Sequence, residues 1–295
     1  MNGIGVIVNV LAALVGGGFG LMFRGKMRAQ YQKLTYSLLG LGVLGVGAYE
    51  LIQSYFVMSN GEVELTGSIL VIVALLVGGL MGYLFRLDEI LEAVGQRLSR
   101  KDEQAKERER NRLERLSRAV DLSIEKGVAP PKVSLLDRLS TYEIPAPLSN
   151  NLYADGFVLA VIFLCANSML LNGVMAESLS GETKILFIKS IADFILCFIL
   201  SFICGSGPLY AVIPMAVQEV FLWFICLVAP DFTVQFLDQT LTGQLSVIGA
   251  VTLLFVGVQM AFDRKKPKAV YLLPSALIPI LYYGILFVVN LFIGD

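Results

Sequence analysis

The chain has 295 residues, of which 56% are hydrophobic and 16% are charged, and its formal net charge is -1. Its mean hydropathy of +0.73 is typical of a polytopic membrane protein and excludes an ordinary water-soluble domain. The sequence contains no histidine, which excludes His-based catalytic triads, His-ligated haem and His-containing metal sites. The four cysteines lie inside apolar runs without a Cys-x-x-Cys spacing, so we expect no disulfide framework, no metal site and no cofactor.

Eight apolar runs of near-spanning length follow one another along the chain. They cover residues 3–23, 35–57, 65–86, 156–175, 184–204, 208–229, 243–262 and 270–293. The sequence therefore predicts an all-α fold, a polytopic α-helical membrane protein with about eight transmembrane helices. We divide it into an N-terminal three-helix membrane part (1–86), a charged cytoplasmic helical insert and linker (87–150) and a C-terminal five-helix membrane part (151–295).

The first and third runs contain an internal repeat of glycine-rich helices. Residues 14–24 match residues 76–86 at seven of eleven positions, and each copy holds a Gly-x-x-x-Gly pair. The pairs are Gly16 with Gly20 and Gly78 with Gly82. Such pairs let membrane helices approach closely, so they indicate either two tightly packed helices or a duplicated transporter scaffold with its site at the repeat interface. Four further glycines predict that the second run is also closely packed: Gly40, Gly42, Gly45 and Gly47.

Basic residues are concentrated on one side of this eight-helix arrangement. Of the 23 Lys and Arg residues, 21 fall in the loop after the first run, in the loop after the seventh run, or within residues 86–150. The opposite loops carry acids, including Glu62, Glu177 and Asp231. The positive-inside rule then places both termini outside and residues 87–150 in the cytoplasm. No basic residue precedes Arg24, so we expect no signal peptide and a first helix that stays in the mature protein.

The insert differs in kind from the rest of the chain. Residues 99–111 contain no large apolar side chain, and a narrow apolar stripe follows them. This pattern is typical of a solvent-exposed helix with one apolar face. Residues 86–150 hold thirteen basic and twelve acidic residues, which argues against binding of nucleic acid. We expect a cytoplasmic spacer or a helix that self-associates, which would make the protein a homo-oligomer.

Short motifs throughout the membrane parts resemble those of one family. They are Gly5-x-x-x-Asn9, the glycine-rich ends of the first and third spans, residues 163–169 (FLCANSM), residues 189–193 (KSIAD), residues 205–207 (GSG), Gln218 and residues 272–274 (LLP). With these motifs the chain resembles the YdfK/YqgA-like bacterial membrane proteins, which carry domain of unknown function number 554. The likeness covers roughly residues 1–98 and 155–290, and it implies a multi-pass protein of the bacterial cytoplasmic membrane without an assigned activity. Glu219 and the length of the insert depart from the family pattern.

Two acids inside apolar runs are the leading site residues. Asp193 and Glu219 each lie near the middle of a run, where a charge costs about 2.5 to 3.5 kcal/mol on the insertion scale. Lys189 precedes Asp193 by one helical turn, so the two share a face and can form an ion pair. This pair either belongs to the site or is a structural pair in which Lys189 extends outward to the membrane surface. Glu219 has an alternative as a protonated packing residue.

Three uncharged polar residues, Asn9, Asn167 and Ser168, either join this site or simply bridge helices. Together with the charged residues they predict a polar path or pocket.

The leading hypothesis is a transporter or channel for a small solute or ion, coupled to a proton or cation, which has the lipid bilayer as its environment. The alternative is a non-catalytic scaffold or regulator that acts through its cytoplasmic helix. We expect no enzymatic activity, because the paired Asp motifs of intramembrane proteases are missing and Ser206 has no visible base.

Overall fold

The computed structural model describes residues 3–23, 29–59, 62–65, 68–98, 150–237, 239–262 and 268–293, with a few single positions between 100 and 115. Most of the predicted charged insert, and the basic loops after the first and seventh runs, lie outside the described residues. In chain order the elements are α1 (Ile4–Phe23), α2 (Ala29–Tyr55), β1 (Phe56–Ser59), β2 (Glu62–Leu65), α3 (Ser68–Leu84), the helix Leu87–Leu98, α6 (Asn150–Ala166), α7 (Ser168–Met175), the π-helix η1 (Ala176–Ser180), α8 (Lys184–Cys204), α9 (Gly207–Val228), α10 (Pro230–Phe236), α11 (Gln239–Ala261), the 3-10 helix η2 (Lys268–Ala276) and α12 (Leu277–Ile293).

The described helices confirm a polytopic α-helical membrane protein. Six candidate spans are long and apolar enough to cross a membrane, and the number rises to eight if each of two bent helix pairs is one span. The bent pairs are α3 with Leu87–Leu98, at 57°, and α6 with the α7–η1 segment, at 43°. Eight spans is the number that the apolar runs predict.

Two local features differ from the predicted runs. The ends of the second and third runs form a short antiparallel hairpin, in which Phe56 pairs with Leu65 and Ser59 with Glu62. Apolar and acidic residues alternate in EVEL, and β-branched or aromatic residues such as Phe56 and Val57 in FVMS favour strands as well. The last run begins as 3-10 helix η2 and becomes α-helical only at α12, since Pro274 has no N–H group to donate to an α-helical ladder.

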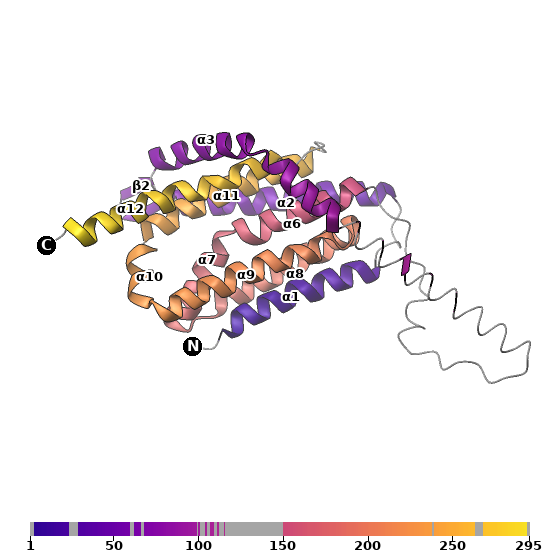
Figure 1. The fold of residues 1–295 in the computed structure, drawn as a ribbon, viewed down its shortest axis with the longest axis horizontal. Helices are drawn as coiled ribbons and strands as arrows, with labels where there is room; N and C mark the ends of the chain where they lie inside the picture. Colours follow the sequence, from indigo (N-terminus) through magenta and orange to yellow (C-terminus); the bar gives the residue numbers. More distant parts are fainter. Residues whose placement is uncertain are drawn as a thin grey trace, which may run out of the picture.

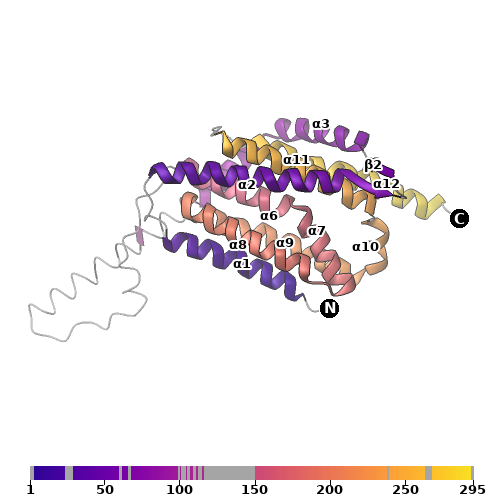
Figure 2. The same ribbon diagram turned by 180° about the vertical axis from the view of Figure 1, so that it is seen from behind.

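Both ends of the described chain lie at one end of the bundle. Figures 1 and 2 show that α1 starts and α12 ends at the same end, which also holds the β-hairpin and α10. The helix Leu87–Leu98 lies at the opposite end (Figure 1). This arrangement is that of a chain which passes through the bundle an even number of times.

Glycines bring pairs of helices into backbone contact. A Cβ at Gly16 or Gly20 would meet backbone atoms of Phe194 or Phe198 in α8, and a Cβ at Gly78 or Gly82 would meet the backbone of η2. The predicted close packing is therefore confirmed at both Gly-x-x-x-Gly pairs. The duplication of a transporter scaffold stays a prediction, since the shared packing does not establish a common ancestry of the two copies.

The four glycines of α2 do not all behave alike. Gly40 and Gly47 pack against α11, where an added Cβ would meet the backbone of Ala261 or Leu254. Gly42 and Gly45 have no atom within 4 Å of an added Cβ, so the prediction of close packing is wrong for these two. They lie on the other side of α2 and border a cavity that is described below.

The largest core cluster surrounds α6, α8 and α9. It joins buried apolar side chains of these helices to others from α1, α2, α7, α11 and η2. The helix pairs that pack most extensively are α1 with α8, α2 with α11, and α6 with α9. The polar residues discussed next are embedded in this core.

Candidate functional site

Four of the six predicted site residues meet in the core between α1, α8 and α9. They are Asn9 from α1, Lys189 and Asp193 from α8, and Glu219 from α9, and we call them the quartet. Each of the four has an exposed fraction of 0%. The alternative in which Lys189 extends outward to the membrane surface is wrong, because its ammonium group points into the core.

The quartet is held together by direct polar contacts. Lys189 forms an ion pair with Asp193 through Nζ and Oδ2, and its Nζ lies 3.6 Å from Glu219 Oε1. The Asn9 side-chain amide Nδ2 donates to Asp193 Oδ2 at 3.0 Å and to Glu219 Oε1 at 2.6 Å. Met215 closes the group, with its sulfur 3.8 Å from Asn9 Nδ2 and 3.9 Å from Lys189 Nζ.

The quartet contains more hydrogen-bond acceptors than donors, and its negative charges outnumber its positive one. Asn9 Oδ1, Asp193 Oδ1 and Glu219 Oε2 are buried without a hydrogen-bond partner among the described residues. Two carboxylates and one ammonium group sum to a charge of -1, which is costly in an apolar interior. The charge is balanced when one carboxyl group holds a proton or when a cation binds beside it.

A second acid positions α1 so that Asn9 reaches the quartet. The Glu177 carboxylate accepts from the backbone N–H groups of Gly5, at 2.7 Å, and Val6, at 3.2 Å, which are among the unsatisfied donors at the start of α1. A Cβ at Gly5 would lie 2.8 Å from Glu177 Oε2, so glycine is required for this approach. The Gly5-x-x-x-Asn9 motif therefore combines a docking position with a site residue one helical turn later.

Glu177 corrects one part of the predicted topology. The sequence placed it in an outer loop, whereas it lies in η1 with an exposed fraction of 1%. A π-helix after α7 turns this side chain inward, toward the start of α1. The charge pattern alone gave no signal for this, because a loop acid and a buried helix-capping acid look the same in sequence.

Asn167 and Ser168 do not belong to the quartet but lie where the fourth span is broken, between α6 and α7. Asn167 has an extended backbone (φ -77°, ψ 131°), and its side chain accepts from Met169 N at 2.7 Å. The carbonyl of Cys165, which Met169 N would bond in a continuous helix, instead accepts from Gln218 Nε2 at 3.3 Å. Both groups freed by the break thus have a partner, so the break is a stable part of the fold.

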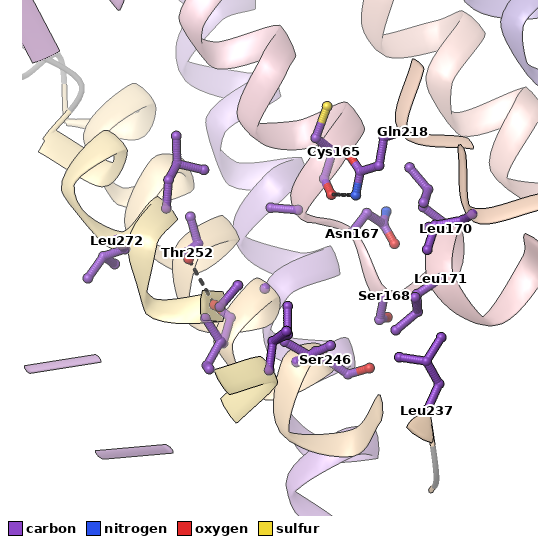
Figure 3. A pocket seen from close by; sticks show the side chains of 18 of the residues that line it. Cys165, Asn167, Ser168, Leu170, Leu171, Gln218, Leu237, Ser246, Thr252 and Leu272 are labelled. Carbon is purple, nitrogen blue, oxygen red and sulfur yellow. Dashed lines mark hydrogen bonds between the residues drawn. The ribbon is translucent and has the colours of Figure 1, made fainter. Parts of the chain in front are cut away.

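The break borders a cavity of about 390 Å³. Figure 3 shows Asn167, Ser168 and Leu171 on one wall and Thr252 and Leu272 on the other. Gln218 lines this cavity, whereas its neighbour Glu219 belongs to the quartet, so α9 presents one polar residue to each. Neighbouring residues on a helix are about 100° apart, which places these two side chains on different faces of α9.

Sequence reasoning missed one intramembrane acid, Glu50 of α2. Its exposed fraction is 3%, and it borders a second cavity of about 400 Å³ between α2, the α6–α7 break and α8. Asn167 lines both cavities, so the break lies between them. The available signal was a single acid in an otherwise apolar run, which was overlooked because Glu50 lies near the end of that run.

The described residues contain no group of three or more His, Cys, Asp or Glu side chains that could hold a metal ion. The four cysteines are free thiols. The polar chemistry of the described core is therefore carried by carboxyl, ammonium and amide groups, with the hydroxyls of the broken helix beside them.

The bundle and its buried quartet define a class, that of polytopic α-helical membrane proteins with an ionisable site inside the helix core. Residues 4–284 match the family model DUF554, described as a protein of unknown function, and the chain belongs to this family. It is 24% identical over 280 residues to the Escherichia coli K12 protein titled "Uncharacterized protein YqgA", an alignment that covers 93% of this chain and 94% of that protein. No solved structure gives a significant match.

Proposed function

We propose that the protein is a membrane transporter or channel for a small solute or ion, and that the quartet is its proton- or cation-coupling site. It functions in the lipid bilayer of the bacterial cytoplasmic membrane, with both termini outside and residues 87–150 in the cytoplasm. The single observation that carries the proposal is the buried quartet with its uncompensated carboxyl group.

A purely structural explanation accounts poorly for this group. An ion pair between Lys189 and Asp193 would be neutral by itself. An apolar residue at position 219 would cover this pair with a smaller desolvation penalty than a carboxylate. Instead the structure adds Glu219 within 3.6 Å of the same ammonium group and leaves three oxygens without partners. Ionisable groups of this kind in membrane spans are characteristic of ion pathways and proton relays.

The broken helix supports the same function. Discontinuous helices at the centre of transporter folds place unpaired backbone groups next to the substrate. Here the α6–α7 break is flanked by two cavities. Adjacent residues of α9 contact the break and the quartet, because Gln218 donates to the Cys165 carbonyl and Glu219 accepts from Asn9. A change of charge at the quartet therefore acts on the helix that also stabilises the break.

Coupled flux in proteoliposomes tests the proposal. The purified protein is reconstituted with a pH-sensitive dye inside, and a panel of ions and metabolites is added outside at a clamped membrane potential. We expect at least one solute to drive proton or cation movement in the wild type, and Glu219→Gln to abolish this movement while the protein still purifies as a folded species. Glu182→Gln is the matched control, because Glu182 is half exposed and, among the described residues, forms an ion pair with an exposed lysine, Lys184. Wild-type flux in the Glu219→Gln variant contradicts the proposal.

The alternative function is a non-catalytic scaffold that acts through the helix predicted from sequence within residues 87–150. Most of that segment lies outside the described residues, so no structural observation favours it. Deletion of residues 101–126 separates the two functions. Retained flux supports the transporter, whereas a folded protein that moves no solute and loses an associated partner on deletion supports the scaffold. A homo-oligomer is compatible with both.

A further inference from the structure

We infer that the cavity beside Glu50 is a binding site for a small organic cation, an ammonium group with an apolar body, and that this cation is the transported solute. The inference rests on the proposed transport function, but its first step, binding of the cation at Glu50, stands on separate observations. These concern the carboxylate, the cavity walls and the position of the cavity relative to the quartet.

The Glu50 carboxylate is buried and lacks a partner of opposite charge. Neither of its oxygens makes a hydrogen bond among the described residues. Ser168, at the start of α7, lies beside this carboxylate, and its hydroxyl and backbone N–H are neutral groups that do not balance the charge. The described ion pairs leave Glu50 out, so its charge calls for a ligand that is itself positive.

The walls of the cavity favour an organic cation over a metal ion. Apart from Glu50, the lining consists of glycines, apolar residues, two aromatic rings and a single amide, from Asn167. The amide oxygen of Asn167 is already used by Met169 N. Hard cations require about six or more oxygen ligands, which this lining cannot supply. An alkylammonium group requires one carboxylate, and aromatic faces such as those of Tyr49 and Phe163 add cation–π attraction.

The size and access of the cavity fit a small ligand. A volume of about 400 Å³ lies within the usual range of sites for small molecules. Gly42 and Gly45 leave space on the α2 wall, where an added Cβ would meet no atom within 4 Å. Tyr49 and Ile188 are well exposed on the outside of the bundle, so the cavity is reached from the side that faces the bilayer. An amine with an apolar body partitions into that region.

The position of the cavity links it to the quartet. Ile188 and Ala192 of α8 line the cavity, and the next residues along the chain, Lys189 and Asp193, belong to the quartet. The two sites therefore flank one helix, α8. A cation at Glu50 and a proton in the quartet repel each other, and such repulsion is the coupling that an exchanger of the two requires.

Calorimetric titration of the purified full chain, in nanodiscs of phosphatidylglycerol, tests the binding step. The probe is benzylammonium, and benzyl alcohol is its neutral match in shape. We expect benzylammonium to bind and benzyl alcohol not to bind at the same concentration. Glu50→Gln should weaken benzylammonium binding by at least about tenfold, which corresponds to about 1.4 kcal/mol. Absence of benzylammonium binding, or equal binding of the two probes, overturns the inference and leaves Glu50 as a proton-binding group only.

A second pair of variants keeps the test valid if Glu50→Gln fails to fold. Gly45→Phe fills the cavity from the α2 wall while Glu50 itself is kept, and it should abolish binding, whereas Gly45→Ala, the matched control, should leave binding intact. Unchanged binding in Gly45→Phe places the ligand elsewhere and overturns the assignment. Equal loss of stability in Glu50→Gln and Ser168→Ala, without amine binding to the wild type, assigns Glu50 to the support of α7.

Two further experiments identify the source of the ammonium group and test whether its binding depends on transport. If phosphatidylethanolamine in the nanodisc competes with benzylammonium, the cation site stands and its natural occupant is a lipid headgroup. Without such competition the occupant is a free amine. Asp193→Asn should abolish coupled flux yet retain benzylammonium binding, so failure of the coupling site and failure of the cation site give different results.

Discussion

The contacts of the quartet predict that replacing Lys189 lowers the free energy of unfolding more than replacing Asp193 does. In Lys189→Met, two carboxylates are left with the single amide Nδ2 of Asn9 as donor, and removal of one partner from a buried pair costs about 3 to 5 kcal/mol. In Asp193→Asn, the Lys189 ammonium group keeps Glu219 at 3.6 Å, where the attraction is about 4 to 5 kcal/mol at an effective dielectric constant of about 20. That attraction offsets most of the loss, so we expect Asp193→Asn to cost only about 1 to 2 kcal/mol.

The double variant completes the comparison. Lys189→Met with Asp193→Asn removes both members of the ion pair, which is often close to neutral, and leaves Glu219 with Asn9 as its donor. Its free energy of unfolding, measured by reversible unfolding in mixed detergent and SDS micelles, should lie well above that of Lys189→Met alone. The reasoning is refuted if Asp193→Asn is as unstable as Lys189→Met, or if the double variant is no more stable than the worse single variant. The first result would show that Glu219 does not share the ammonium group, and the second would show that unpaired charge does not explain the instability of Lys189→Met.

Three further predictions address packing, docking and topology. Gly16→Val should lower the free energy of unfolding by about 1 to 3 kcal/mol or more, because its side chain meets the backbone of α8, while Gly18→Val, which meets no atom within 4 Å, should be almost neutral in the same assay. Glu177→Gln should cost about 1 to 3 kcal/mol, since a charged acceptor at the start of α1 becomes a neutral one, and a variant as stable as wild type would contradict the capping role. In a cysteine-free background, Glu62→Cys should react with an impermeant thiol reagent on intact cells and Gln104→Cys should not, and the reverse pattern would invert the orientation.

The spans and the chemical nature of the site could be predicted from sequence because both are local properties. Apolar runs of spanning length require no knowledge of their neighbours, and an acid in such a run, as at Asp193, is conspicuous. The i, i+4 spacing of Lys189 and Asp193 likewise fixes a shared face. Their meeting with Asn9 and Glu219 depends on contacts between residues about 180 to 210 positions apart, for which a single sequence gives no measure.

Other parts of the site required the three-dimensional structure for different reasons. The helix break at Asn167 is encoded in one side chain that caps Met169 N, and asparagine in an apolar run is equally compatible with a continuous helix. Glu50 and Glu177 were missed because acids near the ends of apolar runs are normally at the membrane surface. Only the contact of η1 with the start of α1, and the position of Glu50 beside the α6–α7 break, show that these two carboxylates are buried.

The docking of α1 also sets an order for biosynthesis. Gly5 and Asn9 are synthesised about 170 to 210 residues before Glu177, Asp193 and Glu219, their partners in the finished protein. When α1 first leaves the ribosome it carries a polar side chain and an open helix start with nothing to bond in the bilayer. α1 is therefore made before its partners and reaches its final contacts only after α8 and α9 have been inserted. Chains that end before α9 carry an Asn9 that lacks its Glu219 acceptor.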